Sequence, residues 1–180
     1  MQPDRTDFRI SRSSLTDPSD PAQVVWDVIE PMWDELGTPY EQDDRLQSAA
    51  TAGQRALYAL HWTNSEVCNG GFHQYFANPT GMLTAEAIAG AYLVGAAGYG
   101  EAIERAASVF GPSVPPTQDE RQGRLARLTV DETQLLNASD EKWYELLQSL
   151  ATNLEWYVSK YVDEHPGDFF VEPQALPRGS

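Results

Sequence analysis

Apolar residues recur every three or four positions along most of the chain, which is the spacing that places them on one face of an α-helix. Between residues 20 and 36, for example, Val25, Ile29, Trp33 and Leu36 form one such stripe. No segment alternates apolar and polar residues over the length of a strand with hairpin turn residues at its end. The pattern therefore predicts an all-α fold, a single-domain helical bundle of roughly seven to nine helices.

Proline and capping residues predict where the helices begin and end. Asp20 followed by Pro21 is typical of an N-cap and a first helical residue. Pro31 removes one backbone hydrogen bond inside the first stripe, so we expect a kink or a second helix start there. Ser139 begins a further helix-start pattern, and Pro166 ends the last apolar stripe.

The two ends of the chain differ from its middle. Residues 1–19 and 173–180 are polar and lack a sustained period, so we expect flexible tails on a single helical domain of residues 20–172. A short helical segment is also expected at 41–46.

The most unusual stretch of the sequence is Asn-Gly-Gly-Phe at 69–72 with its flanks. Gly70 lies where a left-handed residue that ends a helix is expected. Phe72, Tyr75 and Phe76 fall at i, i+3 and i+4, the spacing of an aromatic face on a second helix. The residues of this motif are Glu66, Asn69, Gly70, Gly71, Phe72, Gln74, Tyr75, Phe76 and Asn78.

Glu66 lies one turn before the glycine pair. A carboxylate there can turn back toward the free backbone amides near Gly71 and Phe72, where hydrogen bonding and the helix dipole both favour it. We therefore expect Glu66 to be a structural anchor of the turn.

A family resemblance is carried by residues 59–81. They read Ala-Leu-His-Trp at 59–62 and Glu-Val-Cys-Asn-Gly-Gly-Phe-His-Gln-Tyr-Phe-Ala-Asn-Pro-Thr-Gly at 66–81. This run resembles the signature E-x-x-N-G-G-F-x-Q-Y-F-x-N of a bacterial family of small, acidic, all-helical proteins, first catalogued as a domain of unknown function. The family includes a DNA-mimic protein. The resemblance implies the all-helical fold directly, whereas mimicry depends on a charge pattern that family members need not share.

The chain is strongly acidic, with a formal net charge of -15. This charge argues against direct binding to nucleic acid or to anionic membranes, so we expect a basic partner. The only basic cluster is Arg121, Arg124 and Arg127, which share one face of a helix predicted over 118–128. A single cysteine and a start without a signal peptide favour a cytoplasmic protein.

Most acids fall in two blocks, residues 13–44 and 128–172. Acids three or four apart on a helix are about 5–6 Å apart at Cβ, which is of the order of phosphate spacing along DNA. Together with the resemblance, this predicts an acidic interaction protein, a DNA mimic that occupies the nucleic-acid-binding surface of a basic partner such as a transcription factor. A homodimer is compatible with the sequence. The expected partner-binding residues are Asp27, Glu30, Asp34, Glu35, Asp43, Asp44, Asp163 and Glu164. The simpler interpretation is an acidic surface that keeps a small protein soluble.

Other chemistry is weakly indicated. Cys68, His73 and Asn78 include the residue types of a thiol hydrolase, but a cysteine at the end of a core helix is more often a small buried hydrophobe. His61 and Glu66 miss the i, i+4 spacing of a helical metal pair. We therefore predict no catalytic, cofactor-binding or metal-binding residues, and the sequence leans against an enzyme.

One alternative to the interaction protein stays open. It is a small-ligand-binding protein or an enzyme that uses a pocket around the Asn-Gly-Gly-Phe motif, formed by Glu66, Asn69, His73 and Gln74.

Overall fold

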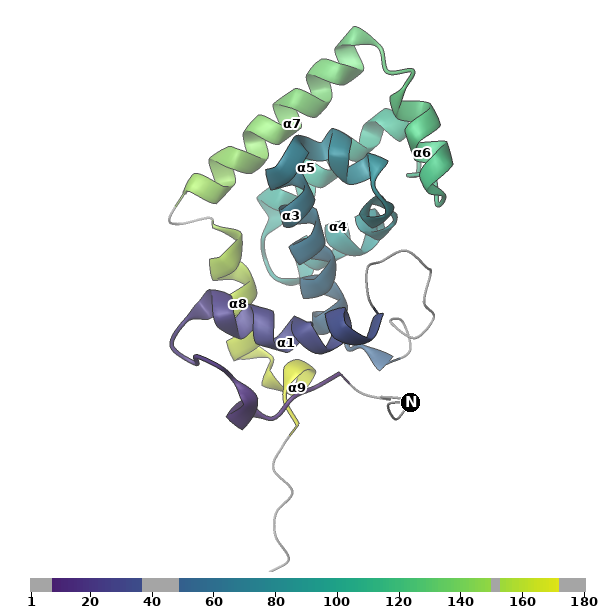
Figure 1. The fold of residues 1–180 in the computed structure, drawn as a ribbon. Coiled ribbons are helices and arrows are strands. Elements are labelled where there is room, and N and C mark those ends of the chain that lie inside the picture. The colour runs from purple at the N-terminus through teal and green to yellow at the C-terminus, as the bar shows by residue number, and fades with distance from the viewer. Residues whose placement is uncertain (1–7, 37–48, 150–152, 172–180) are drawn as a thin grey trace, which may run out of the picture.

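The computed structural model describes residues 8–36, 49–149 and 153–171 (Figure 1). In these ranges the α-helices are α1 (Pro21–Leu36), α3 (Ala52–Ala77), α4 (Thr84–Leu93), α5 (Ala97–Ala107), α6 (Gln118–Leu125), α7 (Val130–Gln148), α8 (Leu154–Glu164) and α9 (Pro166–Phe169). Three 3-10 turns, η1 (Arg12–Ser14), η2 (Pro79–Leu83) and η3 (Ser108–Phe110), complete the described elements. The described residues form no strand, only an isolated bridge between Ile10 and Phe170. The predicted all-α bundle is confirmed.

The bundle is organised around α3. This helix packs against α1, α4, α6, α7, α8 and α9, and Figure 1 shows it enclosed by its neighbours. Leu57, Tyr58, Leu60 and Val67 are all almost completely buried along it. The Asn-Gly-Gly-Phe motif occupies the C-terminal half of this central helix, so its surroundings are set by several elements at once. None of the helices in the described ranges has the length and apolar composition needed to cross a membrane.

The segment before α1 packs on the domain. Phe8 is 1% exposed, and the amide of Ile10 donates to the carbonyl of Phe169 at 3.0 Å. The prediction of a flexible tail over 1–19 is therefore wrong for residues 8–19, because burial of Phe8 and pairing with the chain's other end hold this segment. Residues 1–7, the segment at 41–46 and the expected tail at 173–180 lie outside the described residues.

The first helix begins as the sequence predicts. The Asp20 carboxylate accepts from the amide of Ala22 at 3.0 Å, with Pro21 as the first helical residue. The helix then continues through Pro31 to Leu36, so no second helix starts there. Ile29 and Met32, two positions before the proline and one after it, are fully buried, so packing on the core holds this part of the helix although the proline removes one backbone hydrogen bond.

The long helix α7 begins earlier than predicted. Thr129 and Glu132 form a capping box that starts it at Val130. Ser139 lies inside the helix, where its hydroxyl donates to the carbonyl of Leu135 at 2.9 Å. The predicted helix start at Ser139 is wrong, because a buried serine can satisfy its hydroxyl on the preceding turn.

Candidate functional site

The central helix turns at the two glycines. Gly70 has φ −161° and Gly71 has φ 73°, so the left-handed residue is Gly71, one position later than predicted. A Cβ at Gly71 would lie 2.5 Å from Oδ2 of Asp140. Both the dihedral angle and this close approach require glycine at 71.

Asp140, from α7, holds the free backbone amide after the turn. The amide of Phe72 donates to Oδ1 of Asp140 at 2.7 Å. Burial raises the pKa of the Asp140 carboxyl, and the hydrogen bond from Phe72 partly offsets that rise. The prediction that Glu66 fills this role is wrong: the turn presents the amide to α7, and Asp140 reaches it from the far part of the sequence.

Glu66 instead connects the two halves of α3. Its Oε2 accepts from Nε2 of Gln74 and from Nδ2 of Asn78, both at 2.8 Å. Its Oε1 accepts from the hydroxyl of Thr80 at 3.4 Å. Glu66 thus satisfies the side-chain amides of Gln74 and Asn78, and it anchors a different contact from the one predicted.

Arg121, from α6, holds the end of α3. It is 1% exposed, and its guanidinium donates to the carbonyls of Phe76 at 2.9 Å and Asn78 at 2.8 Å. It also donates to the carbonyls of Pro115 at 3.2 Å and Pro116 at 3.0 Å. Burial lowers the pKa of this guanidinium, yet the group stays charged because its usual pKa is so high.

The basic cluster predicted on α6 is therefore not a cluster. Arg121 points inward, Arg124 pairs with Glu132, and Arg127 is exposed. Neighbouring helical arginines were expected to share a face, but the carbonyl-rich end of α3 draws one of them into the core.

The aromatic face of the motif is core. Phe72, Tyr75 and Phe76 are completely buried, as their spacing predicts. The Phe72 ring meets Trp143 edge-on at 5.6 Å, and Phe76 meets Phe110 at 5.0 Å. Burial raises the pKa of Tyr75 to about 12, so its hydroxyl stays protonated. These rings stabilise the fold as part of its core, and none of the three is among the described residues that line the two cavities reported below.

The exposed part of the motif is small. Asn69 and His73 are exposed, and Cys68 is exposed too, so the prediction that Cys68 is buried is wrong. The Cys68 thiol donates to Oδ1 of Asn64 at 3.5 Å, and partial burial raises its pKa. Asn78, the third member of the hydrolase set, is held by Glu66 instead.

His61 and Glu66, the two residues considered for a metal pair, have different partners in the structure. His61 lies among the rings of Trp26 and Trp33, at centroid distances of 5.6 and 5.8 Å, and burial lowers its pKa. Glu66 binds the motif amides instead. The part of the chain that the structure describes contains no group of three or more side chains able to hold a metal ion.

A cleft of about 480 Å³ lies beside the motif, and it shares Gly81 with the motif's C-terminal flank. Met82, Ile88 and Val114 contribute apolar walls, and among the described residues that line the cleft Glu104 alone is charged. None of Glu66, Asn69, His73 and Gln74, the residues of the predicted pocket, is among the described residues that line this cleft. Arg121 fixes its wall, because it ties Pro115 and Pro116 to the end of α3.

A second cavity, of about 290 Å³, lies between α1, α3, α7 and α8. Trp26 and Val158 contribute apolar walls, and His61, Asn64 and Glu155 contribute polar groups. Asn64 is already engaged, because its Oδ1 accepts from the Trp143 indole at 3.2 Å.

The predicted partner-binding residues do not all face solvent. Asp27 is 6% exposed, and its carboxylate accepts from the amide of Thr16 at 2.6 Å and from Nε2 of Gln23 at 2.7 Å. Asp27 therefore holds the segment before α1 and cannot contact a partner as predicted. Glu30, Asp163 and Glu164 are exposed. Asp34 and Glu35 lie in the last turn of α1, but their side chains are not among those that the structure describes. Asp43 and Asp44 lie outside the described residues.

The exposed acids of α1 and α8 lie on adjoining elements. The two helices pack together, and the hydroxyl of Ser159 donates to the carbonyl of Pro21 at 3.4 Å (Figure 1). This contact places Pro21, and with it the start of α1 that Asp20 caps, beside Ser159 of α8. We define the α1–α8 acidic surface as Asp17, Asp20, Glu30, Glu155, Asp163 and Glu164, all of them exposed. Sequence reasoning found the acids in two blocks but not the contact that joins the blocks.

A comparison with protein families matches residues 48–165 to the family described as DMP19-like protein. The matched range contains the whole motif and runs from before α3 through α8, whereas α1 lies before it. No curated protein and no solved structure matches the chain.

Proposed function

The chain belongs to the DMP19-like protein family, and from that premise we propose that it is an interaction protein whose α1–α8 acidic surface binds the nucleic-acid-binding surface of a basic partner. The observation that carries this proposal is the contact between Pro21 and Ser159, which gathers acids from both blocks on adjoining elements. Lys160 is the only lysine or arginine of α1, α8 and residues 13–20.

The geometry supports an array rather than single contacts. Glu155 and Asp163 lie eight positions apart on α8, about 12 Å along the helix axis. Phosphates of one DNA strand advance about 3.4 Å per charge, so α8 alone is sparser than DNA and needs the acids near the start of α1. Each exposed carboxylate contributes about 0–1 kcal/mol, and the summed field of the array is what attracts a basic partner.

The α6–α7 region is a weaker candidate because its charges are more mixed. There Arg124 pairs with Glu132, and Nζ of Lys142 lies 3.3 Å from Oε2 of Glu145. Arg127 is exposed. These nearby cations weaken the negative electrostatic potential that would attract a basic partner.

Capture followed by competition tests the proposal. Immobilised protein is exposed at low salt to lysate of its native cells, and bound proteins are eluted by rising salt or by duplex DNA. Mimicry predicts basic nucleic-acid-binding proteins that both treatments release, since DNA and this chain would compete for one surface. Partners that salt releases but excess duplex DNA does not would contradict mimicry, and so would recovery of no basic protein.

The cleft beside Gly81 favours a second candidate function, small-ligand binding. Its volume suits a small molecule, and Glu104 favours a neutral or cationic ligand over an anion. Ala85 lines the cleft, so Ala85→Trp should abolish stabilisation by any bound compound in a melting screen. Ala89→Trp, one turn further along α4 and also exposed, is the matched control. Compounds that stabilise both variants equally would place the ligand elsewhere.

A further inference from the structure

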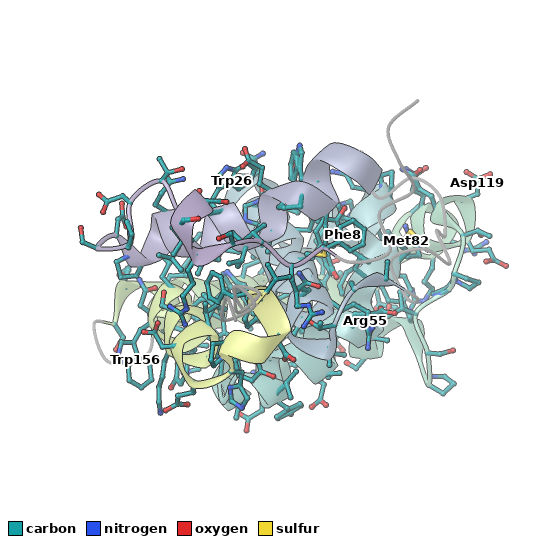
Figure 2. The ribbon with its side chains drawn as sticks, turned by 90° about the horizontal axis from the view of Figure 1, so that it is seen from below. Phe8, Trp26, Arg55, Met82, Asp119 and Trp156 are labelled. Atoms are coloured by element: carbon teal, nitrogen blue, oxygen red, sulfur yellow. The ribbon has the colours of Figure 1, made fainter. Side chains whose placement is uncertain are left out.

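Trp156 is a large aromatic residue on the outer face of α8. It is 50% exposed, whereas Leu154, Val158 and Tyr161 on the inner face are buried. Figure 2 shows Trp156 at the edge of the molecule, at the end opposite Asp119. Because tryptophan is among the residues most enriched at interface hot spots, an exposed one within an acidic surface is a candidate anchor.

The ring of Trp156 already accepts a cation. Nζ of Lys160 lies 5.2 Å from the ring centroid, and the same atom lies 3.8 Å from Oε1 of Glu164. A single positive group therefore contacts both an aromatic face and a carboxylate. The side chain of Lys160 is half exposed, so a partner can reach this position and displace it.

Arginine suits this arrangement better than lysine. The guanidinium is flat and weakly hydrated, so it can stack on an indole while its N–H groups donate to a carboxylate. Lysine offers a compact, strongly hydrated charge that makes only part of this contact. Glu155 directly precedes Trp156, and Glu164 follows it by two turns, so exposed carboxylates lie on both sides of Trp156 along the helix.

We propose that Trp156 anchors the basic partner by stacking an arginine side chain of that partner on its ring, with Lys160 displaced and Glu164 paired to the incoming guanidinium. This inference rests on the proposed function, because it names one contact within the same surface. It adds a requirement that charge alone does not impose: the partner must present arginine, and the chain must present an aromatic ring at 156.

Nona-arginine and nona-lysine peptides serve as probes of equal charge against the full chain. Binding at low salt is followed in ¹H–¹⁵N spectra through the Trp156 indole signal, assigned by its absence in Trp156→Phe. Nona-arginine should shift this signal and bind more tightly than nona-lysine. Trp156→Leu, which keeps apolar area but removes the ring, should weaken nona-arginine binding by about three- to thirtyfold, whereas Trp156→Phe should lose less.

Lys160 offers a second test with a matched control. Lys160→Gln and Lys142→Gln remove the same charge, and both lysines are exposed to the same extent and paired with a glutamate on their own helix. Displacement predicts that Lys160→Gln strengthens nona-arginine binding more than Lys142→Gln does. Circular dichroism verifies that each variant folds.

The outcomes separate this inference from the proposed function. Nona-arginine could bind with strong salt dependence while Trp156→Leu binds it equally well and the indole signal does not shift. That result would contradict the proposal that Trp156 is an anchor, but it would leave the proposed role of the acidic surface intact. Equal effects of Lys160→Gln and Lys142→Gln also contradict the anchor. If neither peptide binds at low salt, both proposals fail.

Discussion

The backbone amide of Phe72 donates a 2.7 Å hydrogen bond to the carboxylate of Asp140, across the gap between the glycine turn of α3 and the middle of α7. The same carboxylate lies 2.5 Å from the position that a Cβ at Gly71 would occupy. One acid from α7 thus satisfies the amide that the turn frees and at the same time requires glycine beside it. Because α3 is the central helix, this contact fixes how α7 lies on the bundle.

Gly71→Ala should destabilise the protein for two reasons. The backbone of Gly71, with φ 73° and ψ −178°, lies in a region that essentially only glycine adopts and that costs another residue about 1–3 kcal/mol, and the added methyl group meets Asp140. Gly95→Ala is the matched control, because Gly95 also has a positive φ, 81°, but nothing lies within 4 Å of its Cβ position. Chemical denaturation should show a larger loss for Gly71→Ala, and equal losses would show that the Asp140 contact is not tight.

Asp140 should give the free energy of unfolding a measurable pH dependence. Its folded pKa is raised, so the folded state binds more protons than the unfolded state between the unfolded and folded pKa values, and this group's contribution falls as pH rises through that window. Asp140→Asn keeps an acceptor for Phe72 and should remove this slope. Denaturation of both proteins at several pH values above the usual aspartate pKa measures the difference, and parallel pH profiles would contradict a raised pKa.

Asp140→Ala tests the hydrogen bond itself. It leaves the amide of Phe72 without its partner and should cost about 1–3 kcal/mol of unfolding free energy, more than Asp140→Asn. A denaturation midpoint equal to that of Asp140→Asn would mean that water or another group satisfies the amide.

Arg121→Met should be among the most damaging single changes in the chain. The guanidinium donates to carbonyls of both the α3 end and the 115–116 segment, and each hydrogen bond from a charged group is worth about 1.5–3 kcal/mol. The exposed Arg127→Met should change stability by less than about 0.5 kcal/mol. Similar melting temperatures for the two variants would contradict the role assigned to Arg121.

How much the sequence could predict depended on the range of each contact. The helix start at Asp20 and the burial of Phe72, Tyr75 and Phe76 follow from spacing within a few residues, and both were predicted. Asp140 reaches Phe72 from another helix, and no local pattern distinguishes it from a surface acid.

Burial of charged groups was the hardest feature to predict. Asp27 and Arg121 both look like surface residues in the sequence, yet each is nearly inaccessible because backbone groups from distant segments bind it. The α1–α8 acidic surface could be located only in part for the same reason. The two acidic blocks are visible in the sequence, whereas the contact between Pro21 and Ser159 that joins them is a property of the fold.

The central claim is that acids of the α1–α8 acidic surface attract a basic partner. The most direct measurement is the association rate of a captured basic partner with two variants that each remove three negative charges. One is Glu30→Gln, Asp163→Asn, Glu164→Gln on the surface, and the other is Glu101→Gln, Asp131→Asn, Glu141→Gln on α5 and α7. The surface variant should associate much more slowly at low salt, with the difference shrinking as salt rises, because steering depends on the local field. Equal association rates for the two variants would contradict the claim and leave the acids as a solvated surface.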